Sequence, residues 1–360
     1  MVQIQFGKLQ ALTVIGYKSI RAVRDLELRD LNIVVGPNGA GKSNLVGLFR
    51  LLGRLALEEL QDFAAKQGGL NKILHFGPKV TGRMELSFRS NRFGYGCVLE
   101  PTAEGTLIFA EEWCSSESAR QSLLVPNQFE TRLMRDKSSR LSSYVHRTIL
   151  SLRVYHFHDT SENSRLRSSS TFTEPDRLAS DGGNLPAFLY FLQEKHAGIL
   201  SRIQDAIQLI APFFGTFVLQ PEALNKDLIR LRWRHKGRDE VFDVNDLSDG
   251  TLRFIALTAL LLQPDPPATI ILDEPELGLH PAALGLLAAL MQRAAPKVQI
   301  IAATQSPTFA DQFGWQDFIV ADRLDDASQY RRLAETEVGP WMDEFAMGEI
   351  WQKNLIGGRP

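Results

Sequence analysis

The sequence predicts an α/β fold built around a parallel core sheet, and three observations lead to that prediction. A glycine-rich segment of the form G-x-x-x-x-G-K-S stands between an apolar strand candidate at 31–35 and a helical pattern from Ser43 to about Lys66. An apolar run at 269–272 ends in two carboxylates. From Leu247 the pattern alternates helix, strand, helix and strand, which is typical of parallel strands joined by right-handed crossovers.

The remaining segments indicate an antiparallel layer and a helical insertion. Apolar runs bounded by turn-forming residues predict further strands, and the spacing of apolar side chains predicts a helix over 185–210. The strand candidates are 9–15, 26–28, 83–89, 95–99, 106–110, 216–219, 228–233 and 241–244. We therefore expect an N-terminal half with an antiparallel β-lobe (1–114), a helical, mildly basic insertion (115–212) and a C-terminal half (213–360).

Charge and cysteine content exclude several classes of protein. The 360 residues include 40 basic and 42 acidic side chains, and a net charge of −2 excludes a polycation made for nucleic acid. The two cysteines, Cys97 and Cys114, are too few for a disulfide framework or a metal site. The longest apolar stretches, 254–262 and 282–291, fall short of the ~18–20 residues of a membrane span. We expect a cytoplasmic protein that binds no membrane.

The glycine-rich segment has the composition of a phosphate-binding loop. Glycines let the backbone fold tightly so that successive N–H groups point at phosphate oxygens, and the following helix adds the positive end of its dipole. Lys42 would reach the β- and γ-phosphates of ATP, and the Ser43 hydroxyl would bind Mg²⁺. The expected nucleotide contacts are Gly36, Pro37, Asn38, Gly39, Ala40, Gly41, Lys42, Ser43 and Asn44.

The two carboxylates that end the 269–272 strand complete the expected chemistry. Ligands bind beyond the carboxyl ends of buried parallel strands. Asp273 would hold Mg²⁺ through water, and Glu274 would polarise the attacking water as general base or as orienting group. Taken with the phosphate loop, the pair predicts an ATPase that converts ATP to ADP and phosphate.

Three further segments resemble motifs of the ABC-type ATPases. Residues 247–251, L-S-D-G-T, resemble the L-S-x-G signature, 274–281 resemble the D-loop after the catalytic glutamate, and 17–19, Y-K-S, resemble the F-K-S element of RecF and SMC proteins. Together they resemble the RecF/SMC/OLD branch of these ATPases, in its stand-alone bacterial form. The resemblance implies a P-loop NTPase of ABC-ATPase type, with a parallel core sheet, an antiparallel β-lobe and a helical insertion.

The resemblance also implies how the nucleotide is held. In this family two heads sandwich two ATP molecules, and the signature of one chain faces the phosphate loop of the other. It therefore implies a homodimer on ATP binding, and further nucleotide contacts from Lys18, Ser19, Ser248 and Gly250.

Two positions depart from the family pattern. Gln305 stands where these ATPases usually carry a switch histidine, and an amide can hydrogen bond to a γ-phosphate but cannot carry a proton. No glutamine matches the Q-loop. His158 or Asp159 could take that place after a strand near 154, and the alternative is a plain polar loop.

The expected function is an ATP-gated dimeric clamp or switch in DNA repair, replication or phage defence. The alternative is an ATP-driven regulatory module that controls a separately encoded effector protein without touching DNA. A transporter ATPase is disfavoured because 231 residues separate Lys42 from Asp273.

Two other segments could contact partners. Residues 115–170 carry nine basic and five acidic side chains, so Arg132, Arg135, Lys137 and Arg140 could contact DNA phosphates, or the segment is a solvated lid. Residues 341–351 predict a helix whose apolar face packs on the chain's own core or enters a partner's groove.

Overall fold

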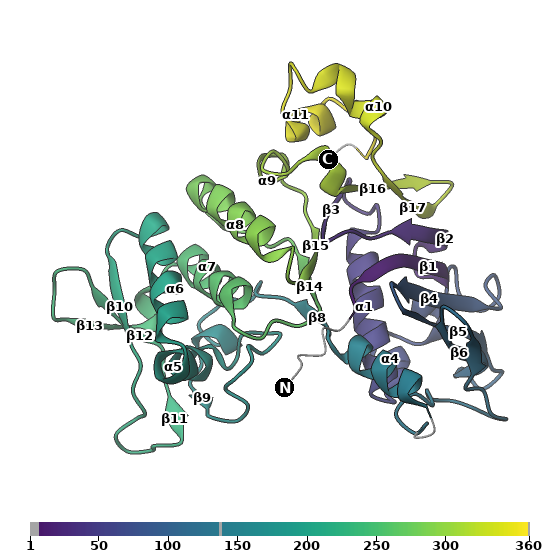
Figure 1. Ribbon diagram of the computed structural model, residues 1–360, viewed down its shortest axis with the longest axis horizontal. Helices are drawn as coiled ribbons and strands as arrows, with labels where there is room; N and C mark the ends of the chain where they lie inside the picture. The colour runs from purple at the N-terminus through teal and green to yellow at the C-terminus, as the bar shows by residue number, and fades with distance from the viewer. Residues whose placement is uncertain (1–6, 137–138, 359–360) are drawn as a thin grey trace. The chain divides into compact units, whose positions relative to one another are not determined.

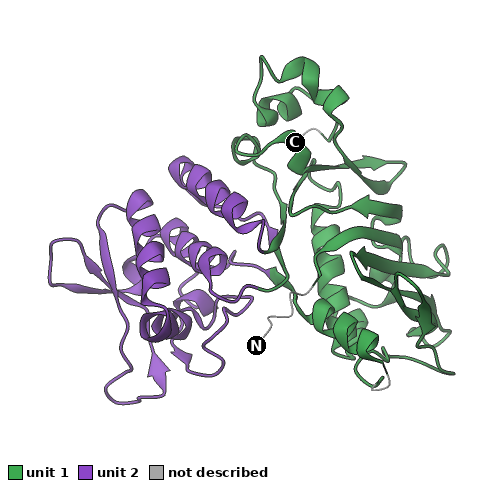
Figure 2. Cartoon of the chain, in the orientation of Figure 1, with its two compact units in different colours: residues 1–154, 267–271, 298–360 green, residues 155–266, 272–297 purple. Residues whose placement is uncertain are grey.

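The computed structural model describes residues 7–136 and 139–358, which form two compact units. Unit 1 comprises residues 1–154, 267–271 and 298–360, and unit 2 comprises residues 155–266 and 272–297 (Figure 2). Each unit is therefore assembled from segments distant in sequence. The expected division at 114 and 212 remains a prediction about sequence organisation.

The core of unit 1 contains a six-stranded sheet in the order β17-β16-β3-β15-β14-β8 (Figure 1). Its central strand β3 pairs in parallel with both β15 and β16, and β17 is an antiparallel edge strand. The bounds are β3 (Leu31–Val35), β8 (Leu152–Tyr155), β14 (Thr269–Asp273), β15 (Gln299–Ala303), β16 (Phe318–Leu324) and β17 (Ala327–Arg332). Strands β3 and β15 are buried at every residue, as expected for a sheet covered on both faces.

A second sheet of unit 1 is antiparallel, in the order β2-β1-β4-β5-β6-β7. The bounds are β1 (Leu9–Tyr17), β2 (Ile20–Glu27), β4 (Met84–Ser90), β5 (Phe93–Pro101), β6 (Leu107–Ser116) and β7 (Arg120–Ser122). The predicted antiparallel β-lobe is thus a six-stranded sheet that the N-terminal strands β1 and β2 join. Helix α1 (Lys42–Ala56) shares a continuous apolar core with this sheet, and α4 (Arg140–Leu150) packs against α1. Helices α2 (Leu60–Lys66) and α3 (Leu70–Ile73) follow α1 along the chain.

The predicted helix from Ser43 to Lys66 is interrupted, which corrects the expectation. Helix α1 ends at Ala56 and α2 begins at Leu60 and ends at Lys66. Glu58 has the left-handed φ of 59° that turns the chain between them. The carboxylate of Glu130 accepts hydrogen bonds from the backbone N–H groups of Leu60 and Gln61, so it caps the new helix. The spacing of apolar residues continues through this break between the helices, so the sequence pattern does not reveal it.

Unit 2 consists of helices and two small antiparallel sheets. The helices are α5 (Leu185–Lys195), α6 (Ala197–Ile210), α7 (Asp249–Leu262) and α8 (Pro281–Ala294). The sheets are β10-β12-β13 and β11-β9, with bounds β9 (Ser170–Thr171), β10 (Phe214–Val218), β11 (Leu228–Ile229), β12 (Arg232–His235) and β13 (Val241–Asp243). The single helix predicted over 185–210 is wrong because the chain leaves the helical conformation at His196, whose φ is −142°.

The C-terminal segment of unit 1 contains the short helices α9 (Pro307–Ala310), α10 (Glu335–Val338) and α11 (Met347–Gln352). The helix predicted over 341–351 is confirmed only for its second half. Ile350 and Trp351 are fully buried and α11 packs against α9, so the predicted docking on the chain's own core is confirmed for this half. No helix among residues 7–136 and 139–358 has the length and apolar character to cross a membrane.

Candidate functional site

The phosphate loop connects β3 to α1 within unit 1. The Lys42 side chain is buried, and its Nζ donates hydrogen bonds to the carbonyl oxygens of Gly36 (2.6 Å) and Pro37 (3.0 Å). The ammonium group therefore lies inside the turn of the loop. Ser43 is exposed in the first turn of α1, where N–H groups lack partners within the helix. The loop thus presents an ammonium group, a hydroxyl group and a helix N-terminus, the groups that recognise phosphate.

A set of polar side chains holds the end of this loop. The Tyr330 hydroxyl on β17 donates to the Gly41 carbonyl oxygen (2.7 Å), and burial raises the pKa of Tyr330, so the hydroxyl stays protonated. Ser19 Oγ lies 2.6 Å from Ser328 Oγ and accepts a hydrogen bond of 2.6 Å from Asn44 Nδ2. Residues from two other segments of the chain, Ser19 and 328–330, therefore fix the start of α1.

Gly41 cannot carry a side chain in this arrangement. Its φ is +105°, and a Cβ atom there would lie 2.7 Å from the Tyr330 hydroxyl oxygen, 2.9 Å from Ser19 Oγ and closer still to Ser328 Oγ. Gly39 has a similar φ of +81° but open space around it. The two glycines share backbone strain and differ in crowding.

We expect Gly41→Ala to lower the free energy of unfolding by about 2–4 kcal/mol, because left-handed strain and overpacking add. Gly39→Ala should lose only the strain component, about 1–2 kcal/mol. Urea titration of both variants measures the difference. Equal losses would show that crowding by Tyr330, Ser19 and Ser328 does not constrain the loop.

The Tyr17-Lys18-Ser19 segment divides between two environments. Ser19 touches the loop helix as described, whereas Lys18 Nζ donates to Gln67 Oε1 (3.0 Å). Burial, assisted by the Arg50 charge, lowers the pKa of Lys18. Ser19 is therefore the residue that this segment places at the loop, and the predicted nucleotide contact of Lys18 stays a prediction.

Gln305 lies at the same edge of the core sheet as the phosphate loop. Strand β15 runs parallel to β3 with Ala303 opposite Val34, and the Thr304 N–H donates to the Val34 carbonyl oxygen (3.0 Å). Gln305 follows directly. The structure therefore brings the predicted switch residue and the loop to the ends of two adjacent strands.

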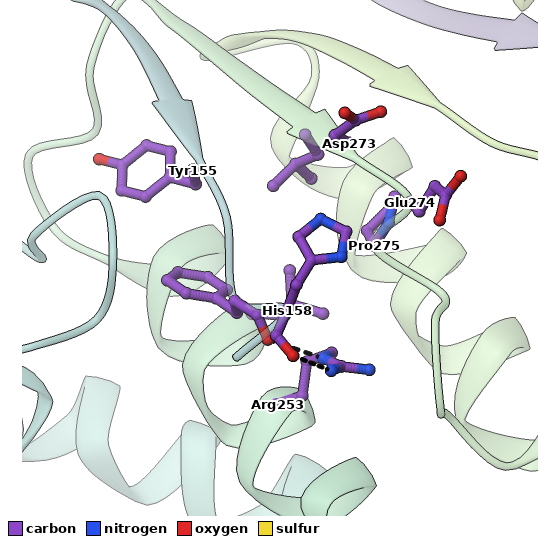
Figure 3. A pocket seen from close by; sticks show the side chains of 9 residues that line it. Tyr155, His158, Arg253, Asp273, Glu274 and Pro275 are labelled. Carbon is purple, nitrogen blue, oxygen red and sulfur yellow. Dashed lines mark hydrogen bonds between the residues drawn. The ribbon is translucent and has the colours of Figure 1, made fainter. Parts of the chain in front are cut away.

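The carboxylate pair lies in a pocket of unit 2 (Figure 3). Its polar lining comes from His158, Arg253, Asp273 and Glu274, and Tyr155, Phe157, Leu257, Leu272 and Pro275 complete it. Glu274 has φ +43°, a left-handed conformation that costs an L-residue about 1–2 kcal/mol. Strain of this kind persists where the surroundings impose it, and it is found most often at functional positions.

The two candidates for the Q-loop position differ in the structure. His158 lines the pocket, and its ring lies beside Pro275 in Figure 3. The carboxylate of Asp159 instead accepts hydrogen bonds from the N–H and Oγ of Ser161 (3.1 and 2.7 Å), which lower its pKa. The structure therefore groups His158, and not Asp159, with the carboxylates.

Arg253 holds the His158 loop against the signature helix. The side chain is buried on α7, and it donates from Nε to the Phe157 carbonyl oxygen (2.8 Å) and from Nη2 to the His158 carbonyl oxygen (2.9 Å). A Cβ atom at Gly278 would lie 2.8 Å from its Nη1, so the D-loop also packs on the guanidinium. Arg253 therefore joins three segments: the signature helix, the His158 loop and the D-loop.

We expect Arg253→Met to lower the free energy of unfolding by about 1–3 kcal/mol, because it keeps the packing of the stem and leaves two carbonyl oxygens without their donor. Arg202→Met, at an exposed position of α6, should stay within about 0.5 kcal/mol of the parent. Denaturant titration compares the two. A parent-like Arg253→Met would show that the guanidinium does not hold this loop.

The predicted signature residues lie at the start of α7. Ser248 is exposed and caps the helix, with its Oγ accepting from the Thr251 N–H (3.2 Å). Asp249 forms a 2.8 Å ion pair with Arg167, whose hydrogen bond lowers the pKa of the Asp249 carboxyl. A Cβ atom at Gly250 would lie 2.5 Å from the Gly278 carbonyl oxygen, so glycine allows the signature and the D-loop to pack closely.

Sequence reasoning missed two groups of residues around these sites. Arg253 had a visible signal, since it is the one charge within the apolar run 252–262. Ser328 and Tyr330 had none, because they lie far along the chain from any motif and reach the loop only through β17.

The fold of the chain is similar to that of SMC heads. One similar solved structure is an SMC head bound to the C-winged helix domain of ScpA (TM-score 0.63, 14% identity, 92% of this chain and 99% of that chain). Another is an SMC head domain with an extended coiled coil bound to the C-terminal domain of ScpA from Pyrococcus furiosus (TM-score 0.58, 13% identity, 94% and 99%).

Residues 31–311 match the family described as "AAA domain, putative AbiEii toxin, Type IV TA system", and the chain belongs to that family. No curated protein matches the sequence. The predicted α/β P-loop fold is confirmed, and the family match together with the likeness in fold to SMC heads supports the predicted resemblance to the SMC-like branch of the ABC-type ATPases.

Proposed function

We propose that the chain binds and hydrolyses ATP and uses the cycle as a dimeric switch. The observation that carries the proposal is the buried Lys42 ammonium inside the phosphate loop, next to the exposed Ser43 hydroxyl. Burying a charged lysine side chain costs free energy unless its ammonium group is paired with an opposite charge and hydrogen-bonded. Carbonyl oxygens hold it here, and a triphosphate is the ligand whose charge it matches.

The residues have distinct roles in this proposal. Lys42 and the loop from Gly36 to Asn44 bind the phosphates, and Gln305 hydrogen bonds to the terminal phosphate. Mg²⁺, when bound, neutralises phosphate charge, and Ser43 and Asp273 are the residues suited to hold it because hydroxyl and carboxylate oxygens are its preferred ligands. Glu274 takes the proton from, or orients, the attacking water.

The proposed dimer places Ser248 and Gly250 of one chain on the ATP of the other. Exposure of Ser248 at the N-terminus of the 14-residue helix α7 supports this, because a helix start favours an anion. The motifs and the likeness to SMC heads supply the remaining support.

We expect Ser248→Arg and Lys42→Ala each to be inactive alone and to regain activity when mixed. Half of randomly paired dimers contain one chain of each kind, and each such dimer has one intact site, so activity should reach about a quarter of the parent. The ATPase rate of the random mixture measures it, and dimers crosslinked as mixed pairs, which should reach about half of the parent rate, exclude slow exchange. Inactive mixed dimers would show that the signature does not serve a partner's nucleotide.

The role of the switch is proposed to lie in DNA transactions, such as repair, replication or phage defence. The alternative is a regulatory module for a separate effector protein, which the toxin system in the family's description favours. The ATPase rate with and without single-stranded and duplex DNA, at stated salt, separates them. Stimulation by DNA supports the first, and a rate indifferent to DNA together with a co-purifying protein supports the second.

A further inference from the structure

A row of cationic side chains follows a segment of unit 2 that contains β11, two connecting residues and β12. Residues 228–238 read L-I-R-L-R-W-R-H-K-G-R, with five basic and no acidic residues in a chain whose net charge is −2. The basic residues occupy every second position. In an extended strand alternate residues share one face, so this spacing gathers Arg230, Arg232 and Arg234 on one side. We call these three residues the arginine row.

The opposite side of the strand is fixed by its core. Ile229, Leu231 and Trp233 are 0%, 1% and 3% exposed. The Trp233 ring stacks on Phe214 (ring centroids 5.9 Å apart) and on Phe242 (4.8 Å), and its Nε1 donates to the Asp243 carbonyl oxygen (3.1 Å). The strand cannot turn over without exposing this cluster, so the arginine row faces solvent permanently.

The neighbours of the row compensate its charge only in part. Arg234 lies opposite Thr216 of β10 and Val241 of β13, both uncharged. Arg232 lies opposite Asp243, whose carboxylate is engaged in capping the next turn. Glu222 contacts two members, Arg232 at 2.6 Å and Arg230 at 3.7 Å. Beyond the row come exposed Lys236 and Arg238, then Asp239 and Glu240 at the hairpin.

We propose that this face of β12 in the β10-β12-β13 sheet (Figure 1), with Arg230 before the strand and Lys236 after it, binds the phosphate backbone of duplex DNA through the arginine row and Lys236. Alternate residues of a strand are about 6.6–6.8 Å apart, so the row spreads its cationic groups evenly along one line. Planar guanidinium groups bind phosphate oxygens in pairs. The row therefore offers several evenly spaced donors for the oxygens of a phosphate backbone.

Duplex DNA is the occupant that this face fits best. Binding of single strands usually adds aromatic rings on which bases stack, and here Trp233 and Phe214 lie on the other side of the sheet. A row of point contacts to phosphates reads no base edge, so binding should be independent of sequence and strongly dependent on salt. This inference rests on the DNA role within the proposed function and not on ATP hydrolysis.

The test compares two triple variants of the full chain that remove equal charge. One is Arg230→Gln/Arg234→Gln/Lys236→Gln. The other is Arg132→Gln/Arg135→Gln/Arg140→Gln in the basic segment that the sequence singled out, where Arg135 is already paired with Glu58 at 2.5 Å and Lys137 lies outside the described residues. Fluorescence anisotropy with a labelled duplex at several salt concentrations gives the slope of log K against log salt.

We expect the first triple variant to reduce that slope by about 2.7, at about 0.9 for each phosphate that the variant no longer neutralises, and the second to leave it unchanged. Arg234→Gln alone should reduce it by about 0.9, which keeps the test valid if the triple variant folds poorly. Glu222→Gln should tighten duplex binding and steepen the slope, because it releases Arg232 for phosphate. Removal of an ion pair that has no bearing on DNA would not produce that gain.

Several results would overturn the inference. They are a reduced slope in the second triple variant alone, tighter binding of single-stranded than of duplex DNA, or an acidic peptide that displaces the duplex at equal charge. ATP hydrolysis without DNA is measured in parallel and should be unchanged in the first triple variant. DNA binding without ATPase activity would contradict the proposed function and leave this inference standing. ATPase activity without DNA binding would contradict this inference and leave the proposed ATP hydrolysis standing.

Discussion

Lys42→Ala is expected to abolish ATP binding. The Lys42 ammonium is the charge that the loop encloses, and the carbonyl oxygens of Gly36 and Pro37 that now hold it cannot themselves attract a phosphate. Alanine leaves those oxygens pointing into the binding region, so the variant adds repulsion to the loss of attraction. Isothermal calorimetry with a slowly hydrolysed ATP analogue measures the affinity directly.

The control for Lys42→Ala is Lys72→Ala, which removes the same charge from an exposed position of α3 in the same unit. It should bind ATP like the parent. Thermal unfolding of both variants separates a direct effect on the ligand from damage to the loop's structure. ATP affinity of Lys42→Ala equal to that of the parent would sink the phosphate-loop assignment.

Glu274→Gln is expected to keep ATP binding and slow hydrolysis by ~10²–10⁴-fold, the range that a general base contributes. The amide preserves size and hydrogen bonding but cannot accept the proton. Hydrolysis is proposed to release the dimer, so the variant should accumulate as an ATP-bound dimer. Single-turnover kinetics and light scattering measure the two effects.

Glu104→Gln, at an exposed loop of unit 1, is the matched control and should turn over like the parent. Turnover of Glu274→Gln at the parent rate would assign the base to another group. His158 is the first to replace, because it shares the pocket.

The fold could be predicted from local sequence patterns. The predictions of helix bounds that were wrong have a common physical origin. Strands β3, β14 and β15 can be recognised in the sequence as apolar runs because they are buried on both faces. The helix breaks at Glu58 and His196 cannot be recognised in this way, because the spacing of apolar residues continues through each. A capping group or a single backbone dihedral angle ends the helix instead. Such breaks are decided by tertiary contacts.

The residues of the candidate site also differ in whether a local sequence pattern reveals them. Phosphate binding requires glycines, lysine and serine at fixed spacing, so Gly36 to Ser43 are legible in the sequence. The groups that position the site have no such spacing, since Arg253 acts through two backbone carbonyl oxygens. The arginine row can be recognised in the sequence, because basic residues occupy every second position from Arg230 to Arg234.

The side chains that hold the Gly41 segment in place bear on where the chain can be truncated. The family match covers residues 31–311, whereas Ser19, Ser328 and Tyr330 all lie outside it. A fragment trimmed to the match would retain the phosphate loop, the carboxylate pair and the signature, and it would lose the hydroxyl groups that fix the first turn of α1. Such a fragment would have to order its own loop at each binding event. In this chain, the residues that would contact the phosphates and the residues that hold the loop in place therefore have different bounds.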